Sequence, residues 1–157
     1  KSFCEKIQNF NCKIMVYDKY KAGFGNHFIN ECNMKTIYQN CNIISFHVPL
    51  NQENNHLFSI KFIDKMQKPF YILNTSRGNI VNTNDLIKGL RKKKILGAGL
   101  DVIENENDNF TNIKINQNLN YLVNCDNVIL TPHIAGLSTN ANEKLSNILI
   151  NKILNQI

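Results

Sequence analysis

Several residues with reactive or charged side chains follow short apolar runs of this 157-residue chain. Asp18 follows "KIMVY", and Arg77 comes three residues after "FYILN". Asp101 lies near the end of "ILGAGLDV", with Glu106 five residues further on, and His133 follows "NVILT" and Pro132. If these runs are parallel strands, their carboxyl ends lie at one edge of a sheet, where ligands of open α/β sheets bind. The spacing therefore predicts one site built from all of these residues.

His133 and Glu106 suit proton transfer. A neighbouring carboxylate favours the charged imidazolium, which can give a proton to a carbonyl oxygen or take one from a hydroxyl. Glu104 lies closer to the strand, but we expect it to be a solvated loop carboxylate. His47 ends a strand beside Pro49 and is placed to line a cofactor. We expect two further histidines, His27 and His56, to be surface residues.

Arg77 and Asp18 suit ligand binding. The Arg77 guanidinium can hold a carboxylate by two parallel hydrogen bonds, and Gly78 lets the backbone turn close to a ligand. A surface salt bridge is the alternative for Arg77. An aspartate at the position of Asp18 can bind both ribose hydroxyls of an adenine dinucleotide and repels a 2′-phosphate, which favours NAD over NADP. The alternative for Asp18 is an ordinary turn residue.

The elements that must position these residues are short strands alternating with amphipathic helices. Continuous apolar runs predict strands that are covered on both faces, which are typical of a parallel sheet. The five predicted strands are 13–17, 42–48, 70–74, 95–102 and 127–131. Helical spacing of apolar residues occurs near residues 2–10, 59–66, 83–94 and 138–157, with Thr83 as the expected cap of the third helix. The polar stretch 105–124 is longer than an ordinary connection, so we expect it to carry function or a short helix.

Composition narrows the classes of function. Apolar residues make up 43% and charged residues 19%, which is typical of a globular domain, and no apolar run is long enough for a membrane span. The net charge of +6 is spread along the chain without interleaved aromatic residues, so we expect no nucleic-acid partner. Five scattered cysteines with no CxxC pair argue against zinc or a disulfide framework and favour a reducing cytoplasm, and we expect no metal site.

Together these motifs have the pattern of a known family. The segment "YILNTSRGNIVNTNDLIKGLRKKKILGAGLDVIENE", followed by "NVILTPHIAG", resembles the NAD-binding domain of the D-isomer-specific 2-hydroxyacid dehydrogenases. "VYDKY" and "SFHVPLNQENNHLFS" match the same family, and the D-lactate dehydrogenase branch is the most similar in appearance. The resemblance implies a Rossmann-like α/β fold, with a parallel sheet and helices on both faces.

The resemblance also assigns roles to particular residues. It implies that Arg77 binds the substrate carboxylate, that His133 is the acid–base group and that Glu106 supports His133. For the cofactor NAD, it places Asp18 on the adenosine ribose and Asp101 on the nicotinamide carboxamide. The other positions expected to line the cofactor are His47, Pro49, Thr75, Ser76 and Gly136. The implied reaction interconverts a 2-keto acid and a D-2-hydroxy acid, and a homodimer is expected for the full-length protein.

Two departures from the family pattern limit these expectations. The family's glycine-rich loop and first strand should precede "KSFCEKI", so we expect residues 1–137 to be a partial NAD-binding domain of a longer protein. Residues 138–157 would form the helix that returns towards the substrate domain, with an exposed apolar stripe. Gly136 stands where D-lactate enzymes usually carry an aromatic residue, which leaves glyoxylate and hydroxypyruvate open as substrates. A non-catalytic dinucleotide-binding or interaction module of the same fold also stays open.

Overall fold

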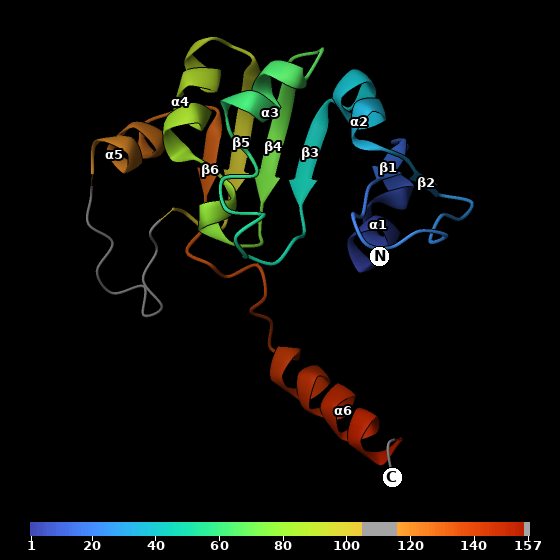
Figure 1. The fold of residues 1–157 in the computed structure, drawn as a ribbon. Coiled ribbons are helices and arrows are strands. Elements are labelled where there is room, and N and C mark those ends of the chain that lie inside the picture. Colours follow the sequence, from blue (N-terminus) through green and yellow to red (C-terminus); the bar gives the residue numbers. More distant parts are fainter. Residues whose placement is uncertain (105–115, 156–157) are drawn as a thin grey trace.

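The computed structural model describes residues 1–104 and 116–155 of the chain. Its centre is a parallel four-stranded sheet in the order β3 (Ile43–Phe46), β4 (Phe70–Asn74), β5 (Ile95–Leu100) and β6 (Val128–Leu130) (Figure 1). A separate parallel pair is formed by β1 (Ile14–Val16) and β2 (Ile29–Glu31). The predicted parallel α/β class is confirmed. All five predicted strands exist, whereas β2 was missed because only three residues of a polar segment form it.

From β2 onward a helix follows each strand, whereas no helix separates β1 from β2 in the residues that the structure describes. The helices are α1 (Ser2–Ile7), α2 (Met34–Asn40), α3 (Ile60–Lys65), α4 (Thr83–Arg91), α5 (Gln117–Val123) and α6 (Ala141–Leu154), with short 3₁₀ turns η1 (Gln8–Phe10) and η2 (Gly78–Ile80). Helix α5 is the short helix expected in the polar stretch. Helix α2, which has no buried residue, was not predicted.

The core lies between the four-stranded sheet and helices α3, α4 and α5, which Figure 1 shows on one side of it. Side chains on this face, such as Phe70, Ile72 and Ile95, are fully buried. Coverage is uneven, because Ile43, Tyr71 and Ile129 on the alternate positions are exposed. The expectation that both faces of these strands are buried is therefore not met in the described part of the chain.

The start of α4 differs from the expectation by one residue. The N-cap is Asn82 and not Thr83, since the Asn82 side-chain oxygen accepts a hydrogen bond of 3.1 Å from the amide of Asp85. The Asp85 carboxylate in turn accepts a bond of 2.9 Å from the amide of Ile60 at the start of α3. These two bonds tie the beginnings of α3 and α4 together.

Helix α6 projects away from the sheet in Figure 1. The apolar residues of α6 are exposed, in agreement with the exposed stripe predicted from the sequence. They include Leu145, Leu149 and Ile153, and each of these is more than half accessible to solvent. None of the helices in the described residues has the length and apolar character needed to cross a membrane.

Candidate functional site

The turn after β6 carries His133 in an unusual backbone conformation. Its φ of 54° lies in the left-handed region, which costs a non-glycine residue about 1 kcal/mol. The backbone amide of His133 donates to the carbonyl of Asp101 at 2.9 Å and to that of Thr131 at 3.0 Å. These bonds compensate for the strained conformation and fix the Cα of His133, while the ring stays half-buried.

The buried Asp101 carboxylate organises the same turn. One oxygen accepts from the Thr131 hydroxyl and, at 2.9 Å, from the amide of Ile134. The other accepts from the amide of Ala135 at 2.8 Å. Burial alone would raise the pKa of Asp101, but the bonds from Thr131, Ala135 and Ile134, with His133 nearby, lower it below its usual value. Asp101 is therefore a charged anchor for the histidine turn.

The turn after β4 carries Arg77 and depends on Asn74. The Asn74 side chain is fully buried. Its oxygen accepts from the amide of Ser76 at 3.1 Å and from the Ser76 hydroxyl at 2.8 Å, and its nitrogen donates to the carbonyl of Arg77 at 2.9 Å. The Arg77 side chain is exposed and donates to the carbonyl of Ser76 at 2.7 Å. The guanidinium therefore extends from a turn of defined shape into solvent.

Backbone hydrogen bonds join the two turns. The amide of Asp101 donates to the carbonyl of Asn74 at 3.0 Å. The amide of His133 donates in turn to the carbonyl of Asp101. Strands are about 4.8 Å apart, so the ends of β4 and β6 lie roughly 10 Å from each other. The structure thus brings the turns of Arg77 and His133 to one edge of the sheet, separated by the width of a small ligand.

Asp18 follows β1, a strand of the two-stranded sheet. One of its oxygens accepts from the amides of Tyr20 and Lys21, at 2.8 and 3.0 Å, which fixes its orientation as in a turn residue. The carboxylate borders an open hollow of about 520 Å³, which Tyr17, Glu31 and Cys32 also line. The hydrogen bonds of Asp18 are those of a turn residue. They use one carboxylate oxygen, and the contact of Asp18 with an adenosine ribose stays a prediction.

Glu53 links the end of β1 to the loop after β3. Its carboxylate accepts from the Lys19 amine at 2.6 Å and from the Tyr20 hydroxyl at 2.7 Å. Because Glu53 follows β3 and Lys19 follows β1, the carboxyl ends of both sheets lie on the same side of the molecule. The strand end that precedes Asp18 therefore lies on the same side of the molecule as the strand ends that precede Arg77 and His133, although β1 belongs to a separate sheet.

His47 and Pro49 come just after β3. The His47 ring contacts the Ser45 hydroxyl at 2.9 Å and the ring of Phe3, whose centroid is 4.9 Å away. Partial burial lowers the pKa of His47 below its usual value. A neutral imidazole at this strand end is compatible with contact to an uncharged part of a cofactor.

Known proteins with similar sequences identify the family. Residues 1–135 match the family model described as "D-isomer specific 2-hydroxyacid dehydrogenase, NAD binding domain". The chain belongs to this family. It is 35% identical to a D-specific alpha-keto acid dehydrogenase of Enterococcus faecium, over 86% of this chain and 42% of the relative. It is 33% identical to a D-lactate dehydrogenase of Staphylococcus aureus, over 87% of this chain and 43% of the relative.

The fold agrees with that of a solved family member. A D-lactate dehydrogenase with NAD⁺ from Lactobacillus jensenii superposes with a TM-score of 0.85 at 25% identity, over 96% of this chain and 47% of that chain. The chain spans less than half the length of these relatives. The family assignment expected from the motifs is confirmed.

The site residues predicted from the sequence differ in how far the structure describes their surroundings. Thr75 and Gly136 are exposed and Ser76 is half-buried, all at the same strand-end edge. Glu106 lies outside the described residues, so its expected pairing with His133 stays a prediction. The contact of Asp101 with a nicotinamide carboxamide also stays a prediction, because the bonds described here place Asp101 in the histidine turn.

Two residues were misjudged from the sequence. His56 and Glu104 were expected to be a surface histidine and a solvated carboxylate. Instead, His56 Nε2 and Glu104 Oε1 are 2.6 Å apart, and only 18% of the Glu104 side chain is exposed. No local signal links residues 48 positions apart in the chain, so only the fold could reveal this pair. Asn74 was also missed, because it was treated as the last residue of a strand.

Proposed function

We propose that this chain is the NAD-binding part of an NAD-dependent oxidoreductase that interconverts a 2-keto acid and a D-2-hydroxy acid, of the D-lactate type. The observation that carries the proposal is the pair of fixed turns that present Arg77 and His133 from the ends of β4 and β6, which lie roughly 10 Å apart. From two neighbouring turns, a long guanidinium side chain and an imidazole can extend toward one small 2-keto acid, whose carboxylate and C2 carbonyl are on adjacent carbons. The family membership of residues 1–135 supports the same activity.

In the proposed mechanism, each side chain has one task. Arg77 binds the substrate carboxylate through two parallel hydrogen bonds and so orients the C2 carbonyl. His133, as imidazolium, donates its proton to the carbonyl oxygen, and Glu106 keeps the ring charged until that step. Bound NADH supplies the hydride that C2 accepts. In the reverse direction, neutral His133 removes the proton from the 2-hydroxyl.

The residues around the strand ends fit the cofactor. A carboxylate such as Asp18, at the rim of a hollow and with one oxygen held by backbone amides, suits the hydroxyls of the adenosine ribose. The nicotinamide end would lie near Thr75, Ser76, Asp101 and Gly136, beside His133. His47 and Pro49 would lie between the two ends.

The domain arrangement is part of the proposal. Residues 1–137 would be a partial NAD-binding domain, completed by other parts of a longer polypeptide, and residues 138–157 would return towards a substrate domain. The exposed apolar stripe of α6 supports this assignment. We further propose a homodimer for the complete protein and a cytoplasmic location; five cysteines without a disulfide are compatible with the latter.

The test is NADH oxidation by the complete protein with pyruvate, glyoxylate, hydroxypyruvate and branched 2-keto acids. We expect His133→Gln to lower kcat by roughly 10²–10⁴-fold, the usual contribution of acid–base catalysis. Arg77→Lys should raise KM for the keto acid, since lysine cannot form the bidentate pair. Unchanged turnover in His133→Gln would contradict the assigned role. Tight NADH binding without reduction of any keto acid would instead favour a non-catalytic dinucleotide-binding module.

A further inference from the structure

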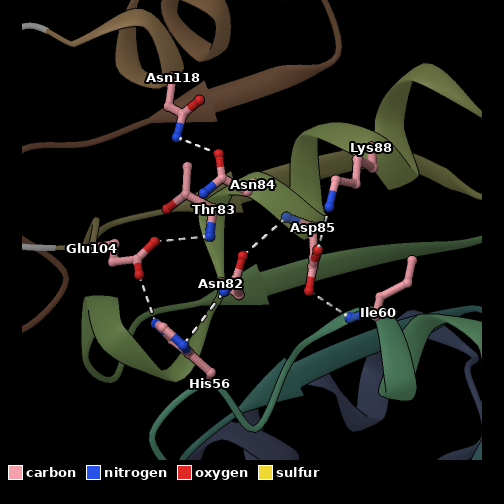
Figure 2. A network of polar contacts seen from close by, with 9 residues as sticks. All are labelled: His56, Ile60, Asn82, Thr83, Asn84, Asp85, Lys88, Glu104 and Asn118. Atoms are coloured by element: carbon pink, nitrogen blue, oxygen red, sulfur yellow. Dashed lines mark hydrogen bonds and ion pairs between the residues drawn. The ribbon is translucent and has the colours of Figure 1, made fainter.

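A polar network joins three segments that are distant in the chain (Figure 2). His56 Nε2 contacts Glu104 Oε1 at 2.6 Å, and the other carboxylate oxygen of Glu104 accepts from the amide of Thr83 at 2.9 Å. The second ring nitrogen of His56 lies 3.4 Å from the side-chain nitrogen of Asn82. Figure 2 shows His56 and Glu104 pointing toward each other from the loop before α3 and the segment after β5.

The backbone around His56 pairs with the turn that follows Arg77. The amide of His56 donates to the carbonyl of Asn79 at 2.8 Å, and the amide of Phe58 donates to that of Ile80 at 2.9 Å. His56 itself has a φ of 53°, a left-handed conformation that costs about 1 kcal/mol and requires support from its surroundings. Its side-chain bond to Glu104 provides such support.

On its other side, the same turn is pressed against the segment that carries Glu104. A Cβ atom added to Gly78 would lie 1.8 Å from the carbonyl oxygen of Ile103 and 2.9 Å from the amide nitrogen of Glu104. The turn Gly78–Ile80 is therefore held between the His56 segment and the Ile103–Glu104 segment. The contact between the His56 ring and the Glu104 carboxylate connects these two sides directly.

We infer that His56 and Glu104 are positioning residues that fix the turn carrying Arg77 and thereby set the affinity for the substrate carboxylate. The consequence for substrate rests on the proposed function of Arg77. Within the described residues, the bond of the Arg77 side chain is to the adjacent carbonyl of Ser76, so the turn itself determines where the guanidinium lies. A misplacement of about 1 Å can cost up to 10²-fold in a bound reaction geometry.

The pair does not contact the site expected for the reacting atoms, so its loss should affect substrate binding more than proton transfer. Replacing His56 with alanine removes the link between the two sides of the turn. Among the described residues, Thr83 then remains as the partner of the Glu104 carboxylate. Glutamine at position 56 can donate to the Glu104 carboxylate from a similar position. The exposed His27, which contacts the ring of its neighbour Phe28, offers a matched control.

The experiment compares His56→Ala, His56→Gln, Glu104→Ala and the control His27→Ala in the complete enzyme. The first readout is hydrogen exchange of the Ile80 and Val81 amides, which donate to the carbonyls of Arg77 and Gly78 and so report on the turn directly. The second is KM and kcat for the 2-keto acid that the wild type reduces.

We expect His56→Ala and Glu104→Ala to accelerate exchange at both amides and to raise KM roughly tenfold, with kcat within about threefold of the wild type. His56→Gln should restore most of both properties, and His27→Ala should change neither. Exchange as slow as in the wild type would overturn the inference, as would a loss of kcat without a change in KM. If the wild type reduces no keto acid, the proposed function fails, and the exchange measurement still decides whether the pair positions the turn.

Discussion

At the scale of single residues, carboxylates buried among backbone amides define the candidate site. Asp101 is 4% exposed and accepts bonds from three residues of the histidine turn. A buried charge is tolerated only where such donors replace water. The position of His133 therefore depends on a residue that need not touch substrate.

Replacing Asp101 with asparagine should destabilise the histidine turn. The amide group keeps one acceptor oxygen but turns its own donors toward the N–H groups that the carboxylate satisfied, so we expect a loss of about 1–3 kcal/mol in the free energy of unfolding. Urea denaturation measures this change. Asp126→Asn, at an exposed position, is the control and should stay within about 0.5 kcal/mol of the wild type. Equal stabilities of the two variants would contradict the anchoring role.

Acidification should lower the free energy of unfolding by protonating three carboxylates that accept hydrogen bonds in the folded state. Burial opposes ionisation of Asp101, Asp85 and Glu104, yet their hydrogen bonds lower each pKa below its usual value. A lowered pKa in the folded state adds stability that is present above the unfolded pKa, about 4, and is lost as the pH falls through the folded value. The free energy of unfolding should therefore decrease below about pH 4. Asp101→Asn should show a weaker dependence, and a flat profile between pH 5 and 3 would contradict the assignment.

At the scale of elements, the functional turns are fixed by close approach of backbone segments. The 3₁₀ turn η2 lies against Ile103, and the left-handed residues His56 and His133 are both held by backbone bonds to neighbouring segments. Such contacts leave no room for a side chain at Gly78. The element that presents Arg77 is thus specified by its neighbours as much as by its own sequence.

Gly78→Ala tests this tight contact. The added methyl group would overlap the carbonyl of Ile103, so the turn must move, at a cost of about 1–3 kcal/mol or more in the free energy of unfolding. Gly136→Ala is the control, because no atom lies within 4 Å of the Cβ position there. We expect the control to stay within about 0.5 kcal/mol of the wild type in urea denaturation. Tolerance of alanine at both positions would show that the approach at Gly78 is not needed.

The N-cap of α4 gives a second test at this scale. Asn82→Ala removes the acceptor for the amide of Asp85 and should lower the free energy of unfolding by about 1 kcal/mol. Asn82→Ser keeps a capping oxygen and should recover most of the loss. Thermal or urea unfolding of both variants measures the difference. Identical values for serine and alanine would mean that the cap contributes nothing.

At the scale of the whole molecule, two elements of the described part of the chain each expose several large apolar side chains. One is the sheet face with Ile43, Tyr71 and Ile129, and the other is the α6 stripe with Leu145 and Leu149. Exposed apolar patches of this kind favour association between protein molecules. The chain of 157 residues therefore presents apolar surface that favours association.

The isolated chain should self-associate in a concentration-dependent manner, and α6 should contribute to this. Replacing Leu145 and Leu149 together with lysine adds charge to the stripe and should shift the distribution toward monomer in sedimentation velocity. The matched control replaces Asn142 and Asn151 of the same helix with lysine, which adds equal charge at polar, exposed positions. An equal shift in both variants would attribute the effect to net charge and not to the apolar stripe.

The amino-acid sequence alone was enough to predict the class of the fold, the strands that end at the site and the family. Apolar runs of strand length and the order of motifs are local properties, so "ILGAGLDV" and "NVILTPHIAG" indicate both strands and roles without coordinates. The polar residues Asp101 and His133 could be singled out because they directly follow such runs. Glu106 was selected because it follows Asp101 by five residues, and its role stays a prediction.

Only the tertiary structure decided which side chains act together. The pairing of His56 with Glu104, the buried role of Asn74 and the use of Asp101 as an anchor all depend on contacts between segments far apart in the chain. The short strand β2 and the division of the sheet in two were also decided at this level, because pairing partners, and not propensity, determine whether a three-residue segment becomes a strand. The left-handed backbone at His133 belongs here as well, since its cost is offset by hydrogen bonds to Asp101, a residue that sequence spacing places 32 positions away.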